Sequence, residues 1–82
     1  MTLPSRDELL DLLRVDLRNL GVRLPDILPS GEDMRTLGLD SLALAEFVAR
    51  VEQRFRYPIP DEVWGEMRTL DQIARWLEEH VR

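Results

Sequence analysis

Leucines recur at helical spacing near the start of this 82-residue chain, and the same spacing of apolar residues returns twice further on. This periodicity most restricts the fold, because the apolar stripes of three helices must be buried against one another. The first helix is predicted from about Arg6 to Leu20, since Ser5 and Glu8 form a capping-box pattern before it and Gly21 suits its end. Its inner face is formed by Leu9, Leu10, Leu12, Leu13, Leu17 and Leu20.

Two further helices and one short one are predicted in the second half of the chain. The second helix begins after Asp40, a good N-cap, and ends at Tyr57, because a residue that precedes proline is pushed out of the helical region. Residues 59–64 are predicted as one or two helical turns, and the last helix follows Thr69, where Gln72 completes another capping box. The second helix is expected to bury Leu44, Val48, Val51 and Phe55, with Leu42, Ala45 and Phe47 beside them, and the last helix Leu70, Ile73, Trp76 or Leu77, and Val81.

Between the first two long helices, prolines and glycines break the helical pattern from Val22 to Leu39. A loop of this length in a compact domain is usually functional or tied down by packing. We expect it to be ordered, with its apolar residues as anchors: Ile27, Leu28, Met34 and Leu37. The predicted fold is an all-α, small four-helix bundle, with a long loop between helices 1 and 2 and a short third helix, in a single domain over residues 1–82.

Charge and composition exclude several function classes. A net charge of −5 and a pI near 4.7 disfavour nucleic acid and anionic membranes as partners and favour a basic protein surface. The chain has no cysteine and one histidine, His80, so no nucleophilic triad, zinc site or other metal site is expected. The N-terminal Met1-Thr2-Leu3-Pro4 lacks a targeting pattern and no apolar run spans a bilayer, so we expect a cytoplasmic monomer.

The candidate functional residue is Ser41, which directly follows the predicted cap Asp40. Because the aspartate caps the helix, the serine hydroxyl is left outward beside the positive end of the helix dipole, where an attached phosphate would be stabilised. Gly38 allows the loop to approach the helix end tightly, and Leu37, Leu39 and Leu42 are expected to pin it. An aspartate cap followed by serine is common at any helix start, so the tripeptide alone is not specific.

The longer stretch Leu37-Gly38-Leu39-Asp40-Ser41-Leu42 resembles the attachment motif of acyl carrier proteins. The similarity continues, in order and spacing, through residues 46–55, 59–62 and 69–73. It implies a carrier, not an enzyme and without catalytic residues, whose Ser41, flanked by Asp40 and Leu42, receives 4'-phosphopantetheine from coenzyme A. A phosphopantetheinyl transferase would attach the arm, and acyl-loading and acyl-processing enzymes would act on the thioester it carries.

The second helix departs from the pattern of fatty-acid carriers, in which it is rich in acidic residues. Here its face is mixed, with Glu46 followed by Arg50 and Arg54, both expected to be solvent-facing. This favours a dedicated partner set, such as a polyketide or other natural-product pathway. In this family the short third helix flanks the groove for the acyl chain, so Trp64 there could touch the cargo. The residues predicted to dock on partner enzymes are Leu42, Glu46, Arg50, Arg54, Asp61, Glu62 and Trp64.

The sequence is compatible with one preferred function and two alternatives. A free-standing acyl carrier protein is the first interpretation of the sequence. A peptidyl, aminoacyl or D-alanyl carrier would share the fold and the arm and differ only in its loading enzyme. A helical interaction module would have the fold without modification of Ser41.

Overall fold

The computed structural model describes residues 3–81 and contains four α-helices and one short 3-10 helix. In chain order these are α1 (Arg6–Arg18), η1 (Met34–Leu37), α2 (Ser41–Phe55), α3 (Asp61–Trp64) and α4 (Leu70–His80). Over that range there is no strand, so the all-helical prediction is confirmed. Met1 and Thr2, which belong to the N-terminal stretch predicted to lack a targeting signal, lie outside the described residues.

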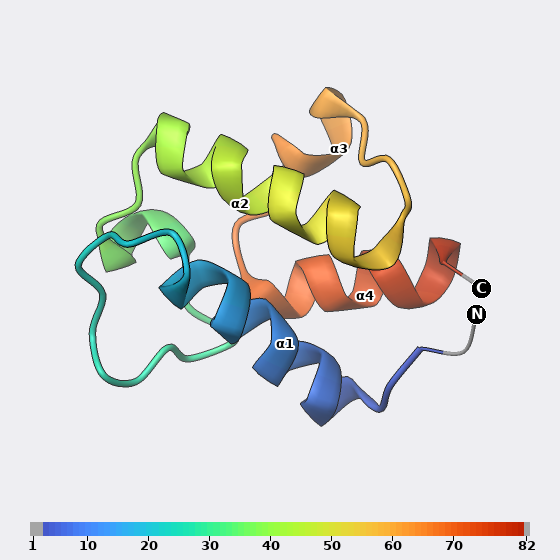
Figure 1. The fold of residues 1–82 in the computed structure, drawn as a ribbon, viewed down its shortest axis with the longest axis horizontal. Coiled ribbons are helices and arrows are strands. Elements are labelled where there is room, and N and C mark those ends of the chain that lie inside the picture. Colours follow the sequence, from blue (N-terminus) through green and yellow to red (C-terminus); the bar gives the residue numbers. More distant parts are fainter. Residues whose placement is uncertain (1–2, 82) are drawn as a thin grey trace.

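The three long helices pack around one core, with α1 in contact with both α2 and α4. Figure 1 shows the long connection from α1 looping around one end of the bundle, while α3 lies beside α2 at the opposite side from α1. The described ends of the chain lie near each other at the end of the bundle remote from this loop. Among the described residues, no helix is both long and apolar enough to cross a membrane.

Side-chain caps define where the helices begin, as predicted. The hydroxyl of Ser5 accepts a hydrogen bond from the Glu8 amide at 3.3 Å, and Thr69 and Gln72 form the complete reciprocal capping box. The end of α1 differs from prediction, because the helix stops at Arg18 rather than Leu20 and Asn19 is its C-cap. Local hydrogen bonding thus marks helix starts more sharply than helix ends.

The predicted buried face of α2 is confirmed for Val48, Val51 and Phe55, which are all buried. Phe47 is fully buried and Ala43 is nearly so, whereas Leu44 is only half-buried. Leu42 and Ala45, which were expected beside the stripe, are exposed. Ala43, Phe47 and Val51 lie one turn apart and are all buried, so the buried stripe runs through these positions and Leu44 lies at its edge.

The core draws on α1, η1, α2, α4 and the long loop, and Val63 and Trp64 of α3 pack against it while only partly buried. In α4 the inner position belongs to Leu77, which is fully buried, while Trp76 is half-buried and stacks on exposed His80 at 4.2 Å between ring centroids. The buried hydrophobic residues are Leu9, Leu10, Leu13, Leu17, Leu28, Met34, Leu37, Leu39, Ala43, Phe47, Val48, Val51, Phe55, Ile59, Leu70, Ile73, Ala74, Leu77 and Val81.

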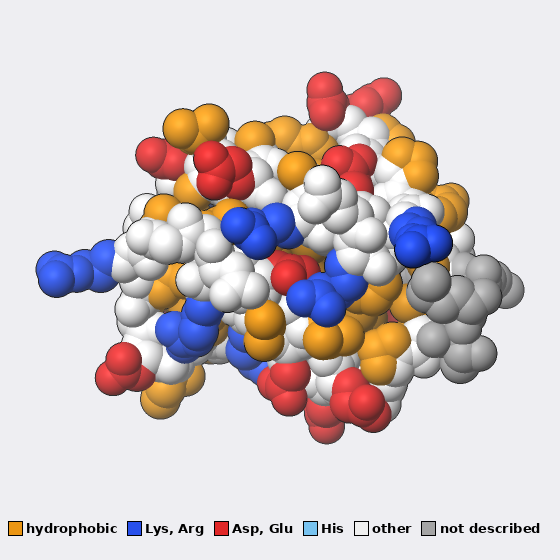
Figure 2. Space-filling model, in the orientation of Figure 1, with side chains coloured by type: hydrophobic (Ala, Val, Ile, Leu, Met, Phe, Trp, Pro, Cys, Tyr) orange, Lys and Arg blue, Asp and Glu red, His pale blue; other side chains and the backbone are white. Residues whose placement is uncertain are grey.

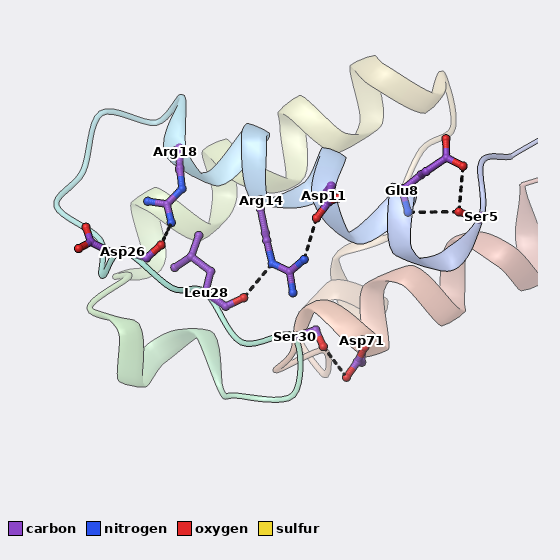
Figure 3. A network of polar contacts seen from close by, with 9 residues as sticks. All are labelled: Ser5, Glu8, Asp11, Arg14, Arg18, Asp26, Leu28, Ser30 and Asp71. Atoms are coloured by element: carbon purple, nitrogen blue, oxygen red, sulfur yellow. Dashed lines mark hydrogen bonds and ion pairs between the residues drawn. The ribbon is translucent and has the colours of Figure 1, made fainter.

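The loop after α1 is tied down by hydrogen bonds, as Figure 3 shows. The guanidinium of Arg14 donates to the carbonyl of Leu28 at 2.9 Å, and that of Arg18 donates to the carbonyl of Asp26 at 2.6 Å. The Ser30 hydroxyl donates to the Asp71 carboxylate at 3.1 Å, which joins the loop to α4. An ordered loop is therefore confirmed.

Three of the four predicted loop anchors are buried, namely Leu28, Met34 and Leu37. The fourth, Ile27, is 75% exposed, so that prediction was wrong. Helix η1 was not predicted; it begins where the Asp33 carboxylate accepts a hydrogen bond from the Arg35 amide at 2.8 Å. Its four residues are too few to show a helical period in the sequence.

Candidate functional site

Ser41 is the first residue of α2, and Asp40 is its N-cap. The Asp40 carboxylate accepts a hydrogen bond from the amide of Ala43 at 2.8 Å, and its carbonyl accepts one from Leu44 at 3.0 Å. Ser41 is exposed, and its hydroxyl takes part in none of the side-chain hydrogen bonds found in the described part of the chain. The aspartate caps the helix, so the serine hydroxyl is available for chemistry.

The backbone just before Ser41 turns sharply at Gly38. This glycine has φ +94°, in the left-handed region that side chains disfavour, and it ends η1. Leu37 and Leu39 on either side are buried and hold the turn against the core. Leu42 does not help to pin the loop as expected, because it is 70% exposed beside the serine. A rigid turn and an exposed apolar side chain therefore flank the hydroxyl.

A small cavity of about 170 Å³ opens between η1, α2, α3 and the start of α4, and Ser41 is part of its wall. Its wall is mostly apolar. A hydrogen bond at 2.8 Å from the Met34 amide to the Arg68 carbonyl closes one side. The lining residues are Asp33, Met34, Arg35, Ser41, Leu44, Phe47, Val48, Trp64, Gly65, Met67, Arg68 and Ile73.

The third helix contributes one wall of this cavity through Trp64. The indole is half-buried, and its Nε1 donates to the Asp61 carboxylate at 3.2 Å, which orients the ring. Asp61 and Glu62 are exposed in the first turn of α3. Trp64 and Ser41 are therefore brought together at one cavity, although they are far apart in the sequence.

On α2, the predicted docking residues Glu46 and Arg50 are exposed. Glu46 lies one turn before Arg50, but the two do not form any of the three ion pairs found within residues 3–81. Figure 2 shows acidic, basic and hydrophobic side chains interspersed over the face of the molecule that it presents, with no large area of one charge. The mixed character inferred from the sequence extends to this surface.

Arg54 does not simply face solvent. Its Nε and Nη2 donate to the two carboxylate oxygens of Asp16 at 2.9 and 2.7 Å, and the Asp16 side chain is only 6% exposed. These hydrogen bonds raise the pKa of the Arg54 guanidinium above its usual value, against the opposing effect of burial. Arg54 therefore ties α2 to α1, a role the sequence did not suggest because Asp16 and Arg54 lie on different helices.

Two cavity residues, Arg35 and Arg68, were not predicted as site residues. Arg35 lies in η1 and Arg68 in the segment between α3 and α4, and only the packing of these two segments brings them to the same cavity. No helical period or local motif could have linked them. The residues described hold no cluster of three or more side chains suited to a metal ion.

The fold and the site define a small helical domain with one exposed serine, Ser41, at the start of α2 beside a largely apolar cavity. The protein family described as "Phosphopantetheine attachment site" matches residues 7–77 of this chain. The chain therefore belongs to the phosphopantetheine-binding acyl carrier proteins.

Individual members of the family are similar over most of their length. The acyl carrier protein of Streptomyces coelicolor is 40% identical over 75 residues, which cover 92% of this chain and 79% of that protein. The acyl carrier protein of Helicobacter pylori (strain J99) is 27% identical over 70 residues, covering 85% of this chain and 90% of that protein. That of Wolinella succinogenes is 29% identical over 68 residues, covering 83% and 90%.

Membership makes the chain a carrier and not an enzyme, with a covalently attached 4'-phosphopantetheine as its cofactor. Acyl carrier proteins as a class work with phosphopantetheinyl transferases and acyl-processing enzymes. When bound, the arm supplies a thiol that forms thioesters. The site fits such a group, because Ser41 is exposed and the first amide groups of α2 have no partner within the helix and favour a phosphodiester.

Proposed function

We propose that Ser41 carries the arm and that the chain presents acyl thioesters on it to partner enzymes. The main support for this proposal is that Asp40 caps α2, so that Ser41 stays exposed and its hydroxyl is not needed for capping. The helix dipole favours the negative charge of the phosphodiester at this end. The cavity beside Ser41 offers an apolar shelter for a short acyl group.

Partner enzymes are proposed to dock around the serine through exposed residues of α2 and α3. Leu42 offers an exposed apolar contact next to Ser41, and charged side chains surround it without a single dominant sign. Arg54 is left out of this surface, since its guanidinium is engaged by Asp16. The proposed docking residues are Leu42, Glu46, Arg50, Asp61, Glu62 and Trp64.

A polyketide or other natural-product pathway in the cytoplasm is the proposed setting. The support is the mixed charge on α2, which differs from the acidic helix of fatty-acid carriers. A peptidyl, aminoacyl or D-alanyl carrier is the alternative, and loading enzymes decide between the two. Loading by an acyl-loading enzyme, without loading by an aminoacyl-adenylating enzyme, would support the acyl carrier. Loading by the adenylating enzyme alone would support the peptidyl, aminoacyl or D-alanyl carrier.

Intact mass after incubation with coenzyme A and a broad-specificity phosphopantetheinyl transferase tests the attachment. The wild-type chain should gain the mass of one arm, and Ser41→Ala should gain none while unfolding as cooperatively as wild type. Ser30→Ala is the matched control, because Ser30 bonds to Asp71 away from the site and should leave modification intact. An arm on Ser41→Ala would show that the assignment is wrong, and loss of its cooperative unfolding would show Ser41 to be structural.

The docking proposal is tested by Arg50→Glu in steady-state kinetics of arm transfer or cargo loading. We expect a raised apparent KM with unchanged thermal stability, because Arg50 is exposed and unpaired among the ion pairs described. The effect should shrink at higher salt concentration. Wild-type kinetics with every candidate partner would remove this residue from the docking surface.

A further inference from the structure

Arg35 and Arg68 both line the cavity that Ser41 also lines. The hydrogen bond from the Met34 amide to the Arg68 carbonyl, at 2.8 Å, places the backbone of Arg68 beside that of Met34, the residue that precedes Arg35. Both residues are exposed, and neither belongs to the three ion pairs of the described chain. We call this pair of residues the arginine rim.

The acidic residue that lines the cavity, Asp33, forms no ion pair with either arginine of the rim among the described residues. Its Oδ1 accepts the backbone amide of Arg35 at 2.8 Å and caps η1. Two guanidinium groups at the mouth of one cavity repel each other, and an anion bound between them would relieve this repulsion. The guanidinium fork matches the oxygens of a phosphate or a carboxylate, which it binds through paired hydrogen bonds.

The size of the cavity limits the apolar part of a ligand whose anionic group binds at the rim. Its volume of about 170 Å³ is close to that of an engineered apolar cavity of about 150 Å³ that takes up benzene. The remaining wall is formed largely by apolar side chains, among them Leu44, Phe47 and Trp64. A ligand that uses both parts of the site has a short apolar portion inside and negatively charged oxygens at the rim.

We propose that Arg35 and Arg68 together bind an anionic oxygen group of the arm or of its cargo at the mouth of this cavity. The proposal rests on attachment of the arm at Ser41. The same chemistry has two sources: the phosphodiester of the arm, and a free carboxylate on the carried acyl group. Binding of either group by the arginine rim would fix the orientation of the arm against the protein. Binding of a carboxylate would also favour cargo that carries one.

Nuclear magnetic resonance of the arginine Nε–H groups tests the rim on the carrier itself. Spectra are compared for the unmodified chain, the chain with the arm, and the arm loaded with malonyl or with the neutral acetoacetyl group. If the phosphodiester is the ligand, the signals of Arg35 and Arg68 shift when the arm is added. If the carboxylate is the ligand, they shift with malonyl and not with acetoacetyl.

Single replacements make the assignment specific. In Arg35→Gln the shift at Arg68 should fall to less than half, and in Arg68→Gln the shift at Arg35 should do the same. Arg23→Gln, an exposed arginine of the long loop that does not line the cavity, is the matched control and should change neither. Intact mass of every variant must show the arm in place before loading.

Three results would contradict the proposed role of the arginine rim. An arm attached normally with unmoved Arg35 and Arg68 signals in all forms overturns the rim and leaves the carrier function standing. Equal shifts with malonyl and acetoacetyl, absent when the arm alone is present, also overturn it, because a neutral group would then be recognised. A wild-type chain that never accepts the arm overturns both proposals.

Discussion

The ion pair between Arg54 of α2 and Asp16 of α1 should stabilise the fold strongly. Arg54→Met leaves the Asp16 carboxylate, 6% exposed, without its two hydrogen bonds. Removing one partner of a buried pair costs about 3 to 5 kcal/mol. Because the Arg54 side chain is 33% exposed, water reaches the vacated position, and we expect about 2 to 3 kcal/mol.

This loss is large for so small a domain. A chain of 82 residues is stable by roughly 4 to 12 kcal/mol. One kcal/mol shifts the melting temperature of such a domain by about 4 to 8 °C, so Arg54→Met should lower Tm by about 10 to 20 °C. Thermal and urea unfolding, followed by circular dichroism, measure the change directly.

Two comparisons isolate the ion pair. Arg50→Met removes an exposed arginine one turn earlier on the same helix and should change stability by no more than about 0.5 kcal/mol. Combining Arg54→Met with Asp16→Leu removes the buried charge and should recover most of the loss. If Arg54→Met and Arg50→Met unfold at the same temperature, Asp16 does not depend on Arg54 and the reasoning is refuted.

Three further perturbations test the packing, the turn and the surface charges. Phe47→Ala should cost about 3 to 5 kcal/mol and Leu44→Ala clearly less in urea unfolding, because Phe47 is fully buried and Leu44 only half; equal losses would mean that α2 is rotated differently. Gly38→Ala should destabilise by about 1 kcal/mol through its φ of +94° alone, since a Cβ there meets nothing within 4 Å; an unchanged urea midpoint would contradict this. Arg6 lowers the pKa of Glu78 through their hydrogen bond, so the carboxylate stabilises the fold above the usual glutamate pKa and loses this effect as pH falls through the lowered value. The Tm difference between wild type and Glu78→Gln should therefore be greatest near neutral pH and vanish in acid; a difference that persists in acid would assign it to packing.

The correction at Arg54 changes how charge reversal on α2 is interpreted. The sequence suggested that both Arg50 and Arg54 face solvent, so that reversing either would impair partner recognition more than folding. In the structure both residues are exposed, as expected, but the Arg54 guanidinium also holds the buried Asp16 carboxylate. A recognition defect in Arg54→Glu would have to be separated from loss of the folded state, which makes Arg50 the better probe of docking.

The sequence by itself determined the features that depend on neighbours three or four residues apart. The starts of α1, α2 and α4 follow from caps whose partners lie within one turn, at Ser5, Asp40 and Thr69. The same local rule placed Ser41 on a helix end with its hydroxyl uncommitted. Helix propensity and capping act within one turn, so these features can be read without knowing the fold.

Only the tertiary structure decided which residues from distant segments meet. Three features depend on how whole helices and loops pack: the full burial of Phe47 with Leu42 exposed, the pairing of Arg54 with Asp16, and the presence of Arg35 and Arg68 at one cavity. A helical period defines a stripe roughly 100° wide, within which several rotations satisfy the same sequence. The choice among them is made by close packing of side chains from other parts of the chain, which no local pattern contains.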